Sequence, residues 1–316
     1  MIAVRVTTRT AEAEGICSFE LVAVDGQPLP GFSAGSHVDV TVGGHTRQYS
    51  LCNDPKETHR YLIAVLREPT SRGGSEAMHS QVNVGDVVTI SPPKNHFTLA
   101  HDARGHLLLA GGIGITPILC MAERLAATGA EFELHYCTRS RDRMAFHDRI
   151  ANAAFASKAQ FHFDDGPASQ RFDIAARLAT PVEGEHLYVC GPKGFMDAVL
   201  TTAREKGWPE AQLHCEYFAA DPAPASEGEA FEVQVASSGR IVMVPAGKTV
   251  VQALAEAGVE VQTSCEQGVC GTCITRVLAG TPDHRDLYFT PEEHAANDQF
   301  TPCCSRSKSA RLVLDL

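Results

Sequence analysis

The 316-residue sequence has no excess of positive charge, no long apolar run and no internal repeat. It carries 38 acidic against 27 basic side chains, which gives a formal net charge of -11 and a pI near 5.7. Phosphate binding needs a basic surface, so this balance argues against nucleic acid as a partner. No segment approaches the roughly 20 apolar residues that span a bilayer, and we therefore expect no membrane span.

A signal peptide and a hydrolytic active site are also missing. The first seven residues alternate as in a strand and lack the apolar core of a signal. Eleven cysteines, an odd number without such a signal, favour a reducing cytoplasm in which some bind metal and the rest stay thiols. The sequence shows neither a catalytic triad nor a catalytic pair of carboxylates. We interpret the fourteen histidines, including His37 and His45, as surface or packing residues that form no metal site with acids.

The length exceeds what one hydrophobic core usually supports, so we expect two or three domains. Residues 1–102 contain short strands between turns and no convincing helix, which is typical of a small antiparallel barrel or sandwich. Residues 103–222 alternate strands with helices, which predicts a parallel sheet covered by helices. Residues 223–229 close a Pro-rich linker, and residues 230–316 contain a hairpin, a helix and a final strand. The four strands expected in the parallel sheet are 106–110, 132–137, 160–163 and 186–190.

A cysteine loop in the last segment carries the most specific pattern. Its spacing, C-x4-C-x2-C with a distant fourth cysteine, is that of plant-type [2Fe–2S] clusters. Gly268 and Gly271 allow a close backbone approach and leave N–H groups for hydrogen bonds to the sulfides. Structural zinc is the alternative, but it usually takes two short cysteine pairs and only one is present. The predicted ligands are Cys265, Cys270, Cys273 and Cys303, with Cys304 as the other candidate for the fourth.

These residues carry a resemblance to a known family. Residues 229–316 resemble a plant-type ferredoxin domain of the β-grasp fold, and the whole chain resembles the phthalate dioxygenase reductase family, which includes vanillate demethylase reductase components. The resemblance implies a multidomain chain with an antiparallel β-barrel flavin domain, an α/β parallel-sheet nicotinamide domain of the ferredoxin reductase type, and a [2Fe–2S] ferredoxin domain. In that family a small residue, Ser and Arg follow the last ligand, which matches Cys303 to it.

Two short patterns in the first segment suit a flavin, although each alone could be a solvated turn. One is R-x-Y-S from Arg47, and the other is S-R-G-G-S from Ser71, which joins a cation to glycine N–H groups. The resemblance implies that both belong to an FMN site, with Phe218 covering one face of the ring. FMN is preferred to FAD because the chain has no insertion to hold an adenosine half. The FMN contacts carried over by position are Arg47, Tyr49, Ser50, Ala64, Val65, Arg72, Gly74, Ser75 and Thr116.

Two glycine turns predict the nicotinamide site. The first follows a strand and begins a helix, so its N–H groups and the positive helix end suit a pyrophosphate, although a purely structural turn stays an alternative. The second is Cys190-Gly191-Pro192, at the end of another strand. In the ferredoxin–NADP reductase superfamily this motif places a cysteine beside the nicotinamide, so we predict that Cys190 lines the hydride-transfer position; a buried core thiol is the alternative. The other predicted NADH residues are Gly111, Gly112, Gly114, Arg139, Gly191 and Pro192.

The choice of dinucleotide depends on three arginines after the second strand. Arg139, Arg141 and Arg143 could clamp a 2′-phosphate, which would favour NADPH, but such arginines are commonly solvated. The resemblance implies NADH.

Together these parts predict an enzyme that moves electrons. A nicotinamide gives up two electrons as a hydride and a [2Fe–2S] cluster takes one at a time, so a flavin between them is needed. We expect electrons to pass from NADH to FMN to [2Fe–2S] and on to an external acceptor. The resemblance implies a Rieske-type non-haem iron oxygenase that demethylates or hydroxylates an aromatic acid or oxidises a similar small substrate, served by a monomeric reductase. The alternatives are a self-sufficient NADH:quinone, dye or ferric reductase and a non-catalytic redox sensor.

Overall fold

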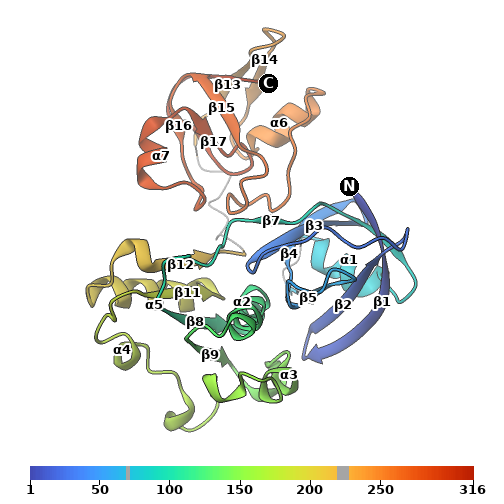
Figure 1. Ribbon diagram of the computed structural model, residues 1–316. Helices are drawn as coiled ribbons and strands as arrows, with labels where there is room; N and C mark the ends of the chain where they lie inside the picture. Colours follow the sequence, from blue (N-terminus) through green and yellow to red (C-terminus); the bar gives the residue numbers. More distant parts are fainter. Residues whose placement is uncertain (69–71, 219–227) are drawn as a thin grey trace. The chain divides into compact units, whose positions relative to one another are not determined.

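The computed structural model describes residues 1–68, 72–218 and 228–316 (Figure 1). The chain divides into two compact units, Met1–Glu216 and Tyr217–Leu316. The predicted boundary at residue 102 falls inside the first unit, and most of the predicted linker, like Ser71, lies outside the described residues. Within the part of the chain that is described, no helix has the length and apolarity needed to cross a membrane.

The first unit begins with a closed antiparallel sheet. Its strands run in the order β4-β3-β6-β1-β2-β5, with β7 paired to β3. A bridge between Leu51 and Ile63 joins the end of β4 to β5, so the two edges of the sheet meet, and the predicted barrel is confirmed. Buried Val38 and Val40 alternate with polar neighbours and turn into the core. The strands are β1 (Ile2–Ala13), β2 (Ile16–Ala23), β3 (Ser36–Val42), β4 (His45–Ser50), β5 (Tyr61–Leu66), β6 (Val87–Ile90) and β7 (Lys94–Asn95).

The expectation that this segment has no helix is wrong. Helix α1 (Gly74–Gln81) lies between β5 and β6. It begins after Gly73, which takes a left-handed φ of 93° and offers no side chain to cap the helix. Beyond its first residue, only Ala77 and Met78 face the core. A single buried pair in eight residues gives no helical periodicity to recognise, because the signal needs apolar residues over three or four turns.

The second half of the first unit is a parallel sheet. All four predicted strands are present. A fifth strand, β12, was not predicted and extends the sheet beyond β11. The order is β10-β9-β8-β11-β12 with every neighbour parallel. The strands are β8 (Gly105–Gly111), β9 (Phe132–Thr138), β10 (Ala159–Phe163), β11 (Glu185–Cys190) and β12 (Leu213–Glu216).

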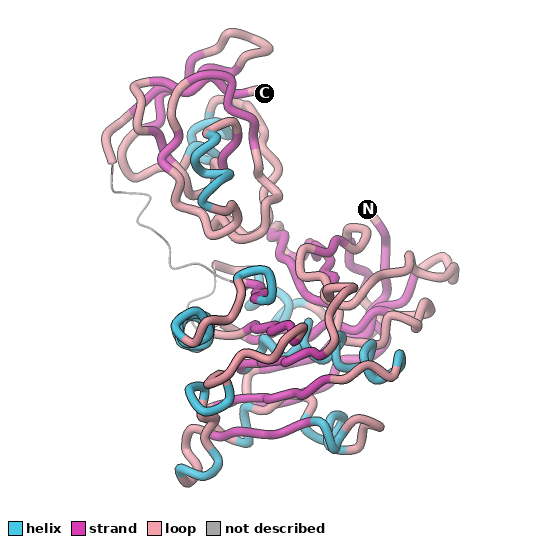
Figure 2. The backbone as a smooth tube through the Cα atoms, turned by 60° about the vertical axis from the view of Figure 1, so that its left-hand side comes forward, coloured by secondary structure: helices cyan, strands magenta, loops and turns pink. Residues whose placement is uncertain are grey.

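Helices lie on both faces of this sheet. From β8 the chain moves to β9 through α2, and from β11 it moves the opposite way to β12 through α5. Because such crossovers are right-handed, α2 and α5 lie on opposite faces, as Figures 1 and 2 show. The helices are η1 (Gly112–Gly114), α2 (Ile115–Thr128), η2 (Arg141–Arg143), α3 (His147–Ala151), η3 (Ala156–Lys158), η4 (Ala168–Gln170), α4 (Ile174–Arg177), α5 (Lys193–Glu205) and η5 (Glu210–Gln212).

The second unit is a small mixed sheet that covers a helix. The order is β14-β13-β19-β15-β17, and the first and last strands of the unit, β13 and β19, pair in parallel. Helix α6 begins at a capping box between Thr249 and Gln252 and packs Leu254 into the core. The elements are β13 (Phe231–Val235), β14 (Ile241–Val244), α6 (Val250–Glu256), β15 (Thr275–Ala279), β16 (Pro282–Asp283), α7 (Pro291–Ala296), β17 (Gln299–Phe300), β18 (Arg306–Ser307) and β19 (Arg311–Leu314).

Candidate functional site

The two predicted glycine turns meet at the ends of β8 and β11. These neighbouring strands send their connections in opposite directions, which makes their carboxyl ends the place where α/β sheets bind ligands. A Cβ on Gly114 would lie 2.2 Å from the Cys190 carbonyl oxygen, and one on Gly191 would lie 2.9 Å from the Gly111 Cα. The two turns therefore touch backbone to backbone, and only glycine fits there. Gly112 has open space but a φ of 53°, which a side chain would strain.

Cys190 lies at this contact, at the last position of β11. Its side chain is fully buried. Burial raises the pKa of the Cys190 thiol well above its usual value, and the neighbouring Glu216 and Cys215 add to the rise. The sulfur is therefore a neutral thiol rather than a nucleophilic thiolate. A neutral, compact group of this kind can line a hydride-transfer position without reacting there.

Glu216, which the sequence analysis did not assign to a site, joins the two predicted sets. It ends β12 and pairs in register with Cys190. Ser50 Oγ, at the end of β4 in the barrel, donates a hydrogen bond of 3.4 Å to Glu216 Oε2. His37 Nδ1 on β3 lies 4.0 Å from Oε1. Thus a predicted flavin residue and the predicted nicotinamide residue Cys190 meet on either side of one carboxyl group.

The environment of Glu216 keeps its carboxyl group largely neutral. Burial raises its pKa to about 8, and the hydrogen bond from Ser50 opposes this only in part. The buried His37 beside it is also uncharged at neutral pH, because burial lowers its pKa to about 4. The residue was missed because β12 has only four residues and no alternating pattern. A lone glutamate at the end of a short strand gives no sequence signal.

The predicted phosphate residues gather where β4 passes the first turn of α1. A Cβ on Gly74 would lie 2.5 Å from Arg47 Cγ, so the arginine stem crosses directly over the helix start. Arg47 Nη2 donates to the Arg72 carbonyl oxygen at 3.4 Å, and Ser75 Oγ accepts from the Glu68 N–H at 3.2 Å. The Arg47 guanidinium, the Ser75 hydroxyl and the first helix N–H groups suit a dianionic phosphate, and Arg72 directly precedes this turn in the chain.

The remaining predicted flavin residues divide between the two units. Tyr49 lies on β4, and burial raises the pKa of its phenol. Ala64 and Val65 are buried on β5, next to β4 where the barrel closes. Thr116 is buried in the first turn of α2 and donates to the Ile113 carbonyl oxygen at 3.1 Å. Phe218 is 38% exposed and belongs to the second unit, so its contact with a flavin ring stays a prediction.

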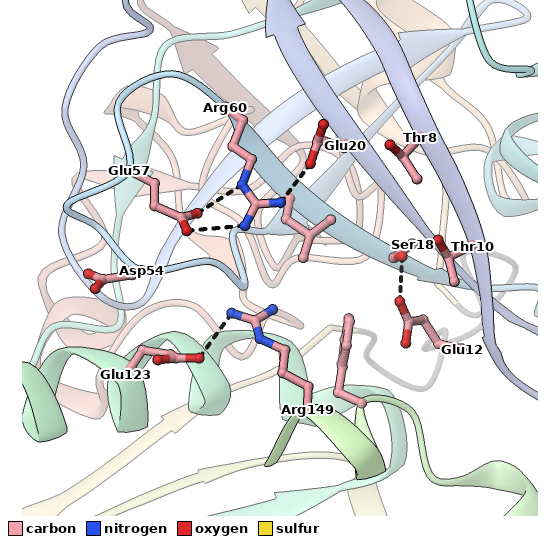
Figure 3. Close-up of a pocket in the computed structure, with 12 residues that line it drawn as sticks. Thr8, Thr10, Glu12, Ser18, Glu20, Asp54, Glu57, Arg60, Glu123 and Arg149 are labelled. Atoms are coloured by element: carbon pink, nitrogen blue, oxygen red, sulfur yellow. Dashed lines mark hydrogen bonds and ion pairs between the residues drawn. The ribbon is translucent and has the colours of Figure 1, made fainter. Parts of the chain in front are cut away.

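A polar cavity of about 470 Å³ lies elsewhere in the first unit (Figure 3). Its two arginines are already paired, Arg60 with Glu20 and Glu57, and Arg149 with Glu123. None of the predicted flavin or nicotinamide residues lines it. The cavity therefore has no part in the site at the strand ends.

The cysteine loop of the second unit brings its four predicted ligands together. Cys265 is hydrogen-bonded to Cys270 and Cys303, which lower the pKa of its thiol, and the Gln267 N–H donates to Cys265 Sγ at 3.3 Å. All four predicted ligand side chains are buried. Four converging thiols with backbone donors around them form the donor set that a [2Fe–2S] cluster requires.

Left-handed glycines shape this loop. Gly268 and Gly271 have φ values of 72° and 69°. A Cβ on Gly271 would lie 2.5 Å from the Tyr288 ring, and one on Gly268 would lie 2.4 Å from Cys304 Sγ. Any other residue would push the loop away from the segment that covers it, so the fit to the cluster depends on these two positions.

The structure favours Cys303 over Cys304 as the fourth ligand. Cys303 is 4% exposed and is hydrogen-bonded to both Cys265 and Cys273. Cys304 Sγ is hydrogen-bonded to Cys303 but not to the three loop cysteines, and it lies 3.2 Å from Thr301 Oγ1 and against Gly268.

One expectation about the histidines is wrong. His284 and His294 come within ligand distance of each other and of Asp286, so these two do group with an acid. No local pattern indicates this, because the nine residues between the two histidines contain a loop and the start of a helix.

Comparison with known proteins shows which family the chain belongs to. A family model for the 2Fe-2S iron-sulfur cluster binding domain matches residues 233–308, and one for the N-terminal domain of dimethylamine monooxygenase subunit DmmA-like proteins matches residues 88–213. The chain is 56% identical to vanillate O-demethylase oxidoreductase of Pseudomonas putida, over all of both chains. It is 40% identical to phthalate dioxygenase reductase of Burkholderia cepacia, covering 99% of this chain and 96% of the relative.

Solved structures of similar proteins match the fold of this chain. A structure of phthalate dioxygenase reductase, described as modular for electron transfer from pyridine nucleotides to [2Fe–2S], matches with a TM-score of 0.79 and 39% identity, covering 100% of this chain and 98% of that one. An intact self-sufficient cytochrome P450 monooxygenase matches with a TM-score of 0.85 and 39% identity, covering 100% of this chain and 41% of that one.

The fold and its sites thus define a flavin- and nicotinamide-dependent iron–sulfur reductase. The chain belongs to the phthalate dioxygenase reductase family. Membership confirms the predicted three-part fold, the oxidoreductase class and the cofactor set of FMN, NADH and a [2Fe–2S] cluster. It also identifies the electron acceptor as an oxygenase component.

The fourth ligand can be tested by matched serine variants. Cys303→Ser is expected to abolish or perturb the visible absorbance and the low-temperature EPR signal of the reduced cluster, because it removes the thiolate that meets Cys265 and Cys273. Cys304→Ser should leave both spectra and the iron content unchanged. A normal spectrum in the first variant and a perturbed one in the second would move the ligand to Cys304.

Glu216, whose side chain is only 16% exposed, predicts a pH dependence of stability. Because its pKa is raised from 4.5 to about 8, folding favours the protonated acid. Its contribution to stability is therefore complete below about pH 4.5 and is lost as the pH rises through 8, by roughly 5 kcal/mol. Thermal unfolding of the first unit, followed by release of flavin fluorescence, should show a slope between pH 5 and 8 that Glu216→Gln flattens. The exposed Glu210→Gln variant should keep the slope, and equal slopes in both variants would contradict the assignment.

Proposed function

We propose that electrons enter at Cys190 and Glu216 as a hydride from NADH, pass to FMN and then to the [2Fe–2S] cluster, and leave to a Rieske-type oxygenase. The observation that carries this proposal is the meeting of Ser50, from the predicted flavin set, and Cys190, from the predicted nicotinamide set, at one largely buried carboxyl group. When bound, the flavin supplies the conversion of a two-electron donor to one-electron transfers.

The chain's own residues position the dinucleotide in this proposal. The turn from Gly111 to Gly114 and the first N–H groups of the fourteen-residue helix α2 receive the pyrophosphate. Pro117 fits this first turn because its missing N–H would have no helical acceptor. Gly191 and Pro192 close the other side. Their close backbone packing fixes the separation of the two turns that would hold the dinucleotide.

At the hydride position the chain supplies neutral groups that exclude water. The Cys190 thiol stays protonated, and Glu216 holds a proton on its carboxyl group while Oε2 accepts from Ser50. Neutral side chains leave the site without a fixed charge that would resist the movement of electrons through it.

The choice of NADH is supported by the arginines after β9. Arg143 Nε is 3.0 Å from Glu14 Oε2, so its guanidinium already forms an ion pair with a residue of the barrel. Arg141 and Arg143 both lie in η2, and Arg139 is exposed just after the strand. We propose that Arg139 contacts the adenosine end of NADH and that no arginine clamp forms around a 2′-phosphate.

The partner and its substrate are proposed from the relatives. Those at 56% and 55% identity are vanillate O-demethylase oxidoreductases, so a methoxy-substituted aromatic acid is the first substrate to try with the partner oxygenase. Other relatives are reductase subunits for phthalate and carnitine oxygenases. We further propose a monomer in the cytoplasm. All eleven cysteines are described and none forms a disulfide, which suits a reducing compartment.

An anaerobic titration of the purified protein with NADH tests the proposed path. Both the flavin and the iron–sulfur absorbance should bleach, and a reduced [2Fe–2S] EPR signal should appear. Loss of flavin colour without a cluster signal would show that electrons do not pass from FMN to the cluster. Bleaching by NADPH but not by NADH would overturn the choice of dinucleotide. Oxygenase turnover that any unrelated reductase supports equally well would favour the self-sufficient alternative.

The phosphate site is tested by Arg47→Gln. This variant should bind FMN roughly 10- to 100-fold more weakly, because a charge-assisted hydrogen bond to phosphate is worth about 1.5–3 kcal/mol. Flavin fluorescence during titration of the flavin-free protein measures the dissociation constant. Arg104→Gln, which removes only an exposed pairing with Glu183, is the control. Equal affinity in both variants would place the phosphate elsewhere.

A further inference from the structure

The segment after the cysteine loop brings together two imidazoles and a carboxylate that the electron path does not use. His284 and Asp286 follow β16, and His294 lies on α7. Their ligand atoms all lie within 4.8 Å of one another. His294 Nε2 is 3.2 Å from Asp286 Oδ2, and His284 Nδ1 is 3.7 Å from Oδ1. Atoms that bind one tetrahedral ion at about 2.0–2.1 Å stand about 3.3–3.4 Å apart, so the spacing is close to that of a metal site.

His284 is the residue that points to a ligand. Its side chain is 8% exposed, and neither ring nitrogen makes a hydrogen bond of ordinary geometry, although Asn297 lies near the ring. Buried polar groups without partners are rare, and each calls for an explanation such as an ion or water.

The carboxylate of Asp286 is already held in position. Its side chain is fully buried. Oδ2 accepts the N–H groups of Tyr288 and Phe289 at 3.2 and 2.9 Å, and Oδ1 accepts from Ser305 Oγ at 3.4 Å. Such outer hydrogen bonds orient metal-binding carboxylates in known sites. They leave both oxygen atoms facing the two imidazoles.

We propose that His284, Asp286 and His294 bind one divalent transition-metal ion, with zinc as the first choice, at a site separate from the iron–sulfur cluster. Two imidazoles and one carboxylate are a donor set that zinc accepts, with water at the fourth position. The His294 side chain is 29% exposed and opens the site to solvent. The two rings stack with centroids 4.4 Å apart and planes 27° apart, so His294 turns its nitrogen toward the ion on binding.

The ion would fasten the segment that covers the cysteine loop. The Leu287 N–H donates to the Gly268 carbonyl oxygen at 3.0 Å, and Tyr288 packs against Gly271. Leu287 and Tyr288 lie between the proposed ligands Asp286 and His294. Binding to the folded state alone stabilises it, so the metal raises the unfolding temperature of the cluster domain.

The test uses untagged holoprotein whose iron and labile sulfide have been counted. After removal of loosely held metal with a chelator, it is titrated with Zn²⁺ in competition with a chromophoric chelator. One Zn²⁺ per chain is expected to bind in addition to the cluster iron, and to raise the unfolding temperature. His284→Gln and His294→Gln should each weaken this binding at least about tenfold. Titrations with Fe²⁺ and Co²⁺ rank the metals.

His147→Gln is the control, because its imidazole packs against Phe161 in the first unit and is not part of the site. It should bind Zn²⁺ like the unaltered chain. The proposal is overturned if no Zn²⁺ binds, or if the double variant His284→Gln, His294→Gln binds it as tightly as the unaltered chain. Should His284→Gln lose iron, His294→Gln decides, since its ring is the more exposed and its replacement leaves the core intact.

Discussion

The close approach of two backbone turns is the constraint on which the first unit depends. Gly114 lies against the Cys190 carbonyl group and Gly191 against Gly111, at distances where no Cβ fits. This contact joins the carboxyl ends of β8 and β11, where the chain's crossovers diverge. It fixes Cys190, and the register between β11 and β12 then fixes Glu216 beside it. Ser50 reaches the same carboxyl group from the barrel, so the two halves of the unit share one small buried site.

The second unit obeys an equivalent constraint by itself. A loop that turns three thiols toward a distant fourth must curve tightly, and the left-handed residues Glu266, Gly268 and Gly271 supply that curvature. The loop has little regular structure to support it. Support comes instead from the segment of Asp286 and Tyr288, whose atoms occupy the space that side chains on the glycines would need. Cluster ligation and the packing of this segment are therefore linked.

The sequence predicted what short-range patterns encode. Short strands between turns predicted the barrel, and strands alternating with helices predicted four strands of the parallel sheet. The cysteine spacing and its glycines predicted the cluster. The sequence could not predict α1, with two buried side chains beyond its first residue, or β12, with four residues. Glu216 and the pair His284 and His294 were missed for another reason. Their environment arises from residues distant in sequence. Neither the burial of these side chains nor their distance from one another can be predicted from the local sequence pattern.

The neutrality of the site at the strand ends follows from its burial. With a pKa of about 8, Glu216 is ionised in only about one molecule in ten at pH 7. A charged carboxylate there would face the buried His37 and the thiol of Cys190, neither of which is cationic, and would lack a counter-charge in a medium of low dielectric constant. Protonation avoids that cost. It also leaves an acidic proton within hydrogen-bond reach of Ser50, at the point where the predicted flavin and nicotinamide residues meet, so that a site built from neutral groups still has one proton that it can hold or release.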